Sequence, residues 1–141
     1  MTKLDSLSPE QRRVMLATAA GWKLVPHQWT NSYNNTNVNG WKAQNPHGLL
    51  SRTAWADHER AWKECGAPEY DTDLNACHAL EAKLTDEQCK VYLAHLETIH
   101  ASDVYESNGD LECPADNYWF HASASQRASA LILTLVEGVK L

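Results

Sequence analysis

Two short stretches contain most of the side chains in this sequence that could take part in chemistry. They cover residues 71–81 and 121–128, and each places polar groups beside an apolar stripe at helical spacing. The candidate residues are Asp73, Asn75, His78 and Glu81 in the first stretch and His121, Gln126 and Arg127 in the second. Carboxylate, imidazole and guanidinium groups can exchange protons, hold a charged ligand or pair with one another.

A hydrolytic triad is one interpretation of these residues. Ser123 or Ser125 would be the nucleophile, His78 or His121 the base, and Asp73 the group that orients the base. The sequence contains no Gly-x-Ser-x-Gly motif, which forms the nucleophile elbow of many hydrolases. We therefore predict no catalytic residue in this set, and a hydrolase of unknown substrate is kept as an alternative.

Metal and phosphate sites are disfavoured by the spacing of their potential ligands. Cys77, His78, Cys89 and His121 can be combined into a zinc site, but their separations match no common zinc pattern. The sequence also lacks a Gly-rich phosphate-binding loop. It therefore predicts neither a metal nor a cofactor.

A structural role fits the two stretches better. Arg127 lies among apolar residues on one side of its helical segment, and a buried guanidinium needs a carboxylate or several carbonyl groups. Glu81 and Asp73 are the candidate partners, and His78 lies three residues before Glu81, close enough to interact on one helix. The pattern predicts a polar network that joins two helices, with Arg127 buried against Glu81 or Asp73.

The helices that must position these residues have recognisable ends. Helices are predicted over residues 9–20, 51–65, about 71–84, 85–100 and 118–136. Ser8 and Gln11 can form a capping box around Pro9, and the first helix can end at Gly21. A second box begins at Thr85, and Ser51 is the expected cap of the helix that Gly66 ends.

Short strands are predicted between the first two helices. Residues 22–25 and 27–30 read as strands separated by Pro26, and Asn39-Gly40 suits a tight hairpin turn before residues 41–43. The Asn-rich segment between them is either a solvated connection or a recognition loop carrying Trp29, Tyr33 and Trp41. The predicted fold class is α+β, a single domain over residues 1–141 with four or five helices packed on a small antiparallel β-sheet, resembling an α/β/α sandwich.

The most charge-biased part of the chain lies between the last two helices. No Lys or Arg occurs from residue 91 to 126, whereas Glu97, Asp103, Glu106, Asp110, Glu112 and Asp116 all fall there. The sequence predicts an acidic loop. It is either simply solvated or, in the functional interpretation, contacts a basic patch on a partner through Asp103, Glu106, Asp110 and Glu112.

Composition narrows the classes of function. The net charge of −6 argues against direct nucleic-acid binding, and no apolar run approaches the ~18 residues of a membrane span. The N-terminus lacks a signal-peptide pattern, so we expect a cytoplasmic protein with reduced thiols at Cys65, Cys77, Cys89 and Cys113. Six Trp against one Phe provide large contact areas, useful in cores and in interfaces.

Three segments resemble a known family. They are Ser-Pro-Glu-Gln-Arg-Arg at residues 8–13 with Gly-Trp-Lys at 21–23, Asp-Leu-Asn-Ala-x-His-x-x-Glu at 73–81, and His-Ala-Ser-Ala-x-Gln-Arg at 121–127. This pattern resembles the phage ABA-sandwich domain of small tailed-phage and prophage proteins. The resemblance implies an α/β sandwich in the cytoplasm of an infected bacterium, and it carries no catalytic role. Residues 24–70 depart from the family and look like an insertion.

Three functional classes follow. The favoured one is a phage accessory protein that binds and inhibits a host protein with a basic surface, such as a CRISPR-type defence component. The alternatives are a binder of a small molecule such as a nucleotide signal, which would need clustered basic residues, and the hydrolase. The twelve Lys and Arg residues are spread along the chain, which disfavours the nucleotide binder.

Overall fold

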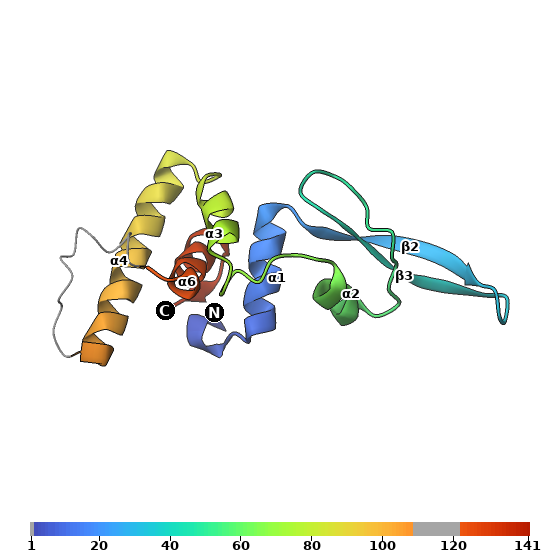
Figure 1. Cartoon of the computed structure of the whole chain (residues 1–141), viewed down its shortest axis with the longest axis horizontal. Coiled ribbons are helices and arrows are strands. Elements are labelled where there is room, and N and C mark those ends of the chain that lie inside the picture. Colours follow the sequence, from blue (N-terminus) through green and yellow to red (C-terminus); the bar gives the residue numbers. More distant parts are fainter. Residues whose placement is uncertain (1, 109–121) are drawn as a thin grey trace. The chain divides into compact units, whose positions relative to one another are not determined.

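The fold is α+β, as the sequence predicts (Figure 1). The structure is a computed structural model that describes the backbone of residues 2–108 and 122–141 and the side chains of residues 2–101 and 122–141. This part of the chain contains five α-helices and four β-strands. Its contacts divide the chain into two compact units. The helical unit comprises Met1–Leu16 and Pro68–Leu141, and the hairpin unit comprises Ala17–Ala67.

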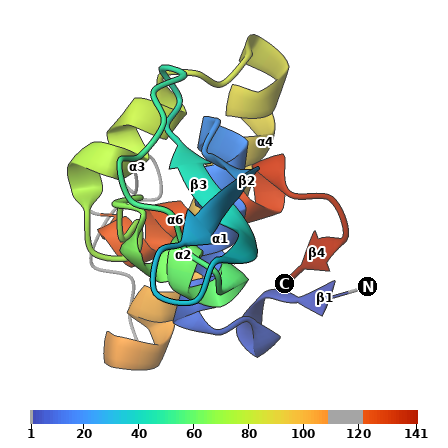
Figure 2. The same ribbon diagram turned by 90° about the vertical axis from the view of Figure 1, so that its right-hand side faces the viewer.

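The helical unit is built around α6, which contacts both α3 and α4. Its elements are β1 (Thr2–Lys3), a 3₁₀ helix (Leu4–Ser6), the first part of α1 (Pro9–Ala20), α3 (Leu74–Glu81), α4 (Asp86–Asn108), α6 (Ala124–Leu135) and β4 (Val139–Lys140). Strands β1 and β4 pair in parallel near the two ends of the chain (Figure 2). The core contains Cys77, Leu96, Leu131 and Ile132, which are fully buried because the apolar stripes of three helices meet there.

Local signals set most of these helix ends. The Ser8 hydroxyl accepts from the Gln11 N–H while the Gln11 side chain accepts from the Ser8 N–H, so the predicted capping box is confirmed. The same reciprocal pair forms between Thr85 and Gln88 at the start of α4. Gly21 follows α1 with φ of 108°, a left-handed conformation that glycine adopts without strain.

The hairpin unit is a long antiparallel pair with one helix against it. Strands β2 (Lys23–Asn31) and β3 (Thr36–Gln44) pair along their full length, and α2 (His58–Glu64) packs on β3. Its core consists of the buried Ala43, Trp55 and Ala61, with Leu24, Trp41 and Cys65 packed around them. The hairpin unit nearly coincides with residues 24–70, the segment that departs from the family resemblance.

The hairpin corrects two predictions about turns. Pro26 does not separate two strands but lies within β2. Among the described strands β2 pairs only with β3, so no strand on its other edge needs the N–H that proline lacks. The turn is formed by residues 32–35, where Asn35 has a φ of 55°. Asn39 and Gly40 instead lie inside β3, because cross-strand pairing overrides the local Asn-Gly turn preference.

Several helix boundaries also differ from the prediction, and α3 spans Leu74–Glu81 rather than about residues 71–84. Helix α2 begins at His58 rather than at residue 51, because Asp57 is its N-cap and Ser51 instead accepts from the Ala43 N–H. Helix α4 continues to Asn108 rather than ending near residue 100, so the predicted acidic loop is wrong for residues 101–108. Helix α6 begins at Ala124 with Ser123 as its N-cap. The prediction that residues 122 and 123 are helical is therefore wrong.

Candidate functional site

The predicted ion pair joins α3 to α6. Arg127 is 8% exposed, and its Nη1 donates to Oε2 of Glu81 over 2.9 Å while its Nε donates to the Ala122 carbonyl. The other Glu81 oxygen lies 3.0 Å from Nδ1 of His78. The prediction that Arg127 is buried and paired with Glu81 is therefore confirmed, and the predicted contact of His78 with Glu81 is confirmed as well.

The remaining residues of the predicted network have other roles. Asp73 takes no part in the Arg127–Glu81 ion pair. It caps α3 instead, because its carboxylate accepts from the Ala76 N–H. Asn75 is exposed on α3. Gln126 closes the capping box of α6 with Ser123, and its Oε1 also lies 3.3 Å from Nδ1 of His100. His121 lies outside the described residues.

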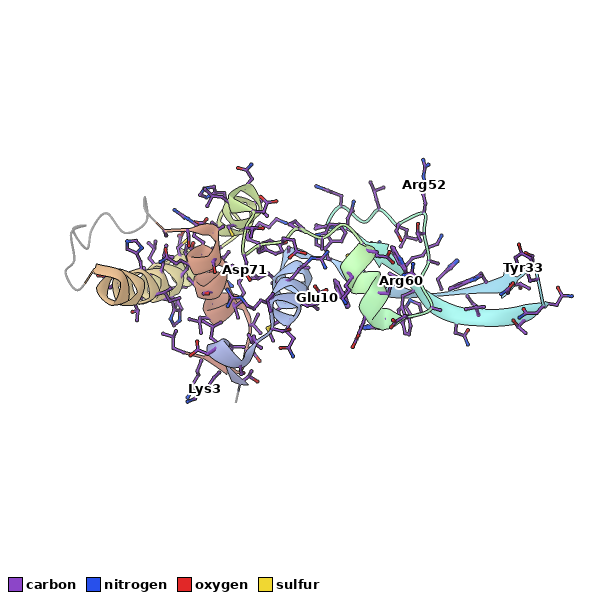
Figure 3. The ribbon with its side chains drawn as sticks, turned by 60° about the horizontal axis from the view of Figure 1, so that its bottom comes forward. Lys3, Glu10, Tyr33, Arg52, Arg60 and Asp71 are labelled. Carbon is purple, nitrogen blue, oxygen red and sulfur yellow. The ribbon has the colours of Figure 1, made fainter. Side chains whose placement is uncertain are left out.

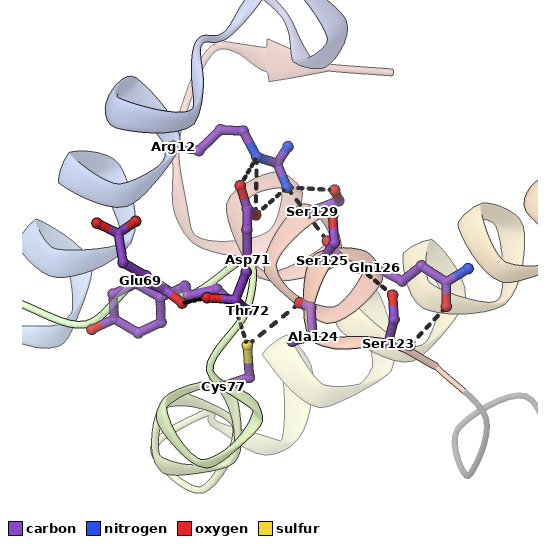
Figure 4. Close-up of polar contacts among 11 residues, drawn as sticks. Arg12, Glu69, Asp71, Thr72, Cys77, Ser123, Ala124, Ser125, Gln126 and Ser129 are labelled. Carbon is purple, nitrogen blue, oxygen red and sulfur yellow. Dashed lines mark hydrogen bonds and ion pairs between the residues drawn. The ribbon is translucent and has the colours of Figure 1, made fainter.

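Sequence reasoning missed a second charged cluster in the helical unit (Figure 4). The guanidinium of Arg12 binds Asp71 through two nitrogens, at 3.1 Å from Nε and 2.8 Å from Nη2. The same Nη2 donates to Oγ of Ser129 over 2.8 Å, so α1, α6 and the segment before α3 meet at one arginine. The buried Arg13 similarly reaches Glu10 and Glu69. Two adjacent arginines on a helix with an apolar stripe were the only sequence signal for this cluster.

Burial perturbs three weak acids between these clusters. Burial, with a further contribution from the negative charge of Glu81, raises the pKa of the Cys77 thiol to about 12. Burial, followed by the influence of Cys77, raises the pKa of Tyr70 to about 12. Burial is also the main cause that raises the pKa of Tyr92. All three groups are therefore held neutral, and the Cys77 thiolate that nucleophilic chemistry would need is suppressed.

These shifts predict a loss of stability at alkaline pH. The ordinary thiol pKa is 9.0, so between pH 9 and 12 the unfolded chain releases the Cys77 proton while the folded chain retains it. The unfolded state then binds fewer protons, and the free energy of unfolding falls as the pH rises. Urea unfolding at pH 7.5, 9 and 10.5 measures this, with Cys77→Ala expected to show a shallower fall. A midpoint that stays constant from pH 7.5 to 10.5 contradicts the assignment.

Of the four carboxylates predicted to bind a partner, two are in a helix and two lie beyond the described residues. Asp103 and Glu106 lie in α4, whereas Asp110 and Glu112 fall in the segment that the structure does not describe. Along the described part of α4, Val91 is 47% exposed and Leu93 is 41% exposed. Helix α4 thus combines carboxylates with exposed apolar side chains, a composition that suits a docking surface.

The three aromatic residues of the predicted recognition loop lie at different places on the hairpin. Tyr33 is at the tip of the turn and is 99% exposed (Figure 3). Trp29 packs over Gly40, whereas Trp41 stands on the opposite face and meets His58 edge-on at 5.1 Å between ring centroids. A shallow hollow of about 360 Å³ opens beside Trp41, lined by Pro26, His27, Gln28, Asn39, Gly40 and Trp41.

Charge is segregated between the two units. Residues 17–67 carry five Lys or Arg and three Asp or Glu, whereas the rest of the chain carries seven and fifteen. The net charge of −6 therefore combines an acidic helical unit with a weakly basic hairpin unit. A whole-chain charge does not describe either surface.

Neither a metal-binding cluster nor a membrane-spanning helix occurs among the described residues. Within residues 2–101 and 122–141, no three His, Cys, Asp or Glu side chains gather closely enough to hold a metal ion. No helix among the described residues is long and apolar enough to cross a membrane.

Comparisons of the chain with protein-family models, with curated proteins and with solved structures found no match. The structure thus defines an α+β protein with two charged clusters and an aromatic hairpin.

Proposed function

We propose that this chain is a non-enzymatic accessory protein of a phage that binds and inhibits a host protein with a basic surface. The observation that carries the proposal is helix α4, which has five carboxylates against one Lys and no Arg and exposes Val91 and Leu93 on two different sides. Exposed apolar side chains supply buried contact area in a complex, and the surrounding charge selects and steers the partner. Its proposed place is the cytoplasm of the infected bacterium.

The class of partner follows from what a carboxylate-rich surface can replace. A run of negative charge resembles the backbone of a nucleic acid, so it fits a protein patch that normally holds one. A component of a bacterial defence system, such as a CRISPR effector, presents such patches. The family resemblance, which is concentrated in residues 8–23 and 71–135, supports a phage origin.

The small-molecule alternative has one structural feature in its favour, the hollow beside Trp41. Its six lining residues include no Lys or Arg, so a nucleotide there would have no side-chain counter-charge for its phosphates. The acidic and apolar surface of α4 therefore supports protein binding better than nucleotide binding.

Neutralising the acidic surface is expected to weaken partner capture at least tenfold at low salt. The variant combines Asp103→Asn, Glu106→Gln, Asp110→Asn and Glu112→Gln. The tagged chain is used as bait in bacterial lysate at about 50 and 300 mM salt, and captured proteins are quantified by mass spectrometry. Wild-type capture should also fall as salt rises, because the Debye length shortens below ~10 Å above 0.1 M.

A charge-matched control separates this surface from net charge. It combines four exposed carboxylates elsewhere, namely Asp5→Asn, Glu59→Gln, Glu64→Gln and Glu137→Gln. This control should capture the same protein as the wild type. Equal capture by the acidic-surface variant at low salt would exclude that surface from the interface.

A further inference from the structure

One face of the β2–β3 hairpin carries an aromatic and cationic surface that the proposed function does not use. Side chains alternate between the two faces of a strand, so the register places Lys23, Val25, His27 and Trp29 of β2 on the same face as Val38, Gly40 and Lys42 of β3. Leu24, Trp41 and Ala43 belong to the opposite face, where the core with α2 forms. We call Lys23, His27, Trp29 and Lys42 the hairpin platform.

The two rings of the platform are stacked on each other. The ring centroids of His27 and Trp29 are 6.0 Å apart, and their planes differ by 21°. The indole of Trp29 covers Gly40 so closely that a Cβ at that position would approach its ring atoms to 2.8 Å. Gly40 therefore lets the indole rest on the strand, and both rings are half-buried rather than enclosed. A further planar group can extend such a stack of nearly parallel rings.

The charge around these rings selects an anionic partner. No Asp or Glu occurs from residue 11 to residue 56, while Lys23 is exposed and Lys42 half-buried on the platform face. The first carboxylate after this stretch is Asp57, which is occupied as the N-cap of α2. A ligand bound here meets the two lysines of the platform, and the strands and turn of the hairpin contribute no carboxylate.

The strand edge argues against a peptide that would extend the sheet. Pro26 lies in the middle of β2 and has no N–H to donate, so an added strand would lose a ladder bond there. Recognition by the platform therefore relies on rings and cations. A single-stranded nucleic acid supplies a planar base and a phosphate in every repeat, which matches both features, whereas an acidic peptide matches only the charge.

We infer that the hairpin platform binds single-stranded nucleic acid, with bases stacked on Trp29 and His27 and phosphates held by Lys23 and Lys42. This site departs from the expectation, based on a net charge of −6, that the chain does not bind nucleic acid directly. The carboxylates responsible for that charge are concentrated in the helical unit. If this chain docks beside the nucleic-acid site of a host protein, the platform would also contact the nucleic acid bound there. The inference itself does not depend on that host protein.

Fluorescence polarisation of the full chain with fluorescein-labelled dT20 and rU20 tests the inference. Wild-type protein is expected to bind both oligonucleotides. The double variant Lys23→Gln, Lys42→Gln should bind at least tenfold more weakly, and Trp29→Leu should lose about tenfold because base stacking is lost. The charge-matched control Lys63→Gln, Lys83→Gln should bind like the wild type.

Three outcomes overturn the inference. The first is no saturable binding of either oligonucleotide by the wild type. The second is an equal loss in the platform and control double variants, which would assign binding to net charge alone. The third is competition by a 20-residue polyglutamate as strong as that by unlabelled dT20, which would show that bases contribute nothing. Circular dichroism checks folding, and if Trp29→Leu is misfolded the lysine variants and the competition still decide.

Discussion

Replacing Arg127 with alanine is expected to lower the free energy of unfolding by about 3 kcal/mol. The substitution leaves the Glu81 carboxylate half-buried without its 2.9 Å partner and removes the donor to the Ala122 carbonyl. Uncompensated buried charge is the costly part, since the intact pair itself contributes little relative to apolar packing. Urea unfolding monitored by circular dichroism measures the change.

The control for this substitution is Arg60→Ala. Arg60 also pairs with a carboxylate, Glu64, but its side chain is 68% exposed. An exposed pair of this kind is worth less than about 1 kcal/mol, so the control should unfold close to the wild-type midpoint. Equal midpoints for Arg127→Ala and the wild type would contradict the assigned role of the α3–α6 ion pair.

Replacing Gly40 with alanine is expected to destabilise the hairpin unit by up to about 3 kcal/mol. Strand propensity alone predicts the reverse, because alanine in a strand is favoured over glycine by about 0.5–1 kcal/mol. The added Cβ would meet the Trp55 carbonyl oxygen and the Trp29 ring, both closer than van der Waals contact allows. One of them must move, and Trp55 holds Trp41 through two backbone hydrogen bonds of 2.8 Å.

The matched control is Asn39→Ala, at the exposed neighbouring position of β3. It changes strand propensity without adding an atom near Trp55, so its unfolding midpoint should change little. Denaturant unfolding followed by tryptophan fluorescence compares the two variants. A Gly40→Ala protein more stable than the wild type would show that propensity outweighs the close approach.

Local chemistry explains which parts of the fold could be predicted. The α1 boundaries and the boxes at Ser8 and Thr85 depend on residues three apart, so the sequence contains all the information they need. The pairing of Arg127 with Glu81 was predictable for a different reason. A buried arginine needs a carboxylate or several carbonyl groups, and the other polar helical stretch, residues 71–81, offers Glu81 and Asp73.

Competition between local and long-range preferences explains the errors. Asn39-Gly40 has the composition of a turn, but moving the turn to residues 32–35 lets nine residues of β2 pair with nine of β3. Ser51 and Asp57 are both good caps, and Ser51 is instead used by the backbone of β3. No local rule ranks these alternatives.

The charged cluster at Arg12 shows the limit most clearly. Arg12 and Asp71 are 59 residues apart in sequence, so no local pattern connects them. The hairpin platform was missed for a related reason. Trp29 and Trp41 look equivalent in the sequence, and only the strand register places them on opposite faces.

Site-specific photo-crosslinking tests the central claim, that the surface of α4 docks on a host protein. The photoreactive residue p-benzoylphenylalanine is introduced in place of Val91 and, as a control, in place of Leu49, an apolar residue of the hairpin unit that is 68% exposed. Irradiation in bacterial lysate at low salt is followed by mass spectrometry of the adducts. We expect position 91 to form one dominant protein adduct that diminishes with salt and is absent from position 49. No adduct at position 91, or the same adducts at both positions, would contradict the account.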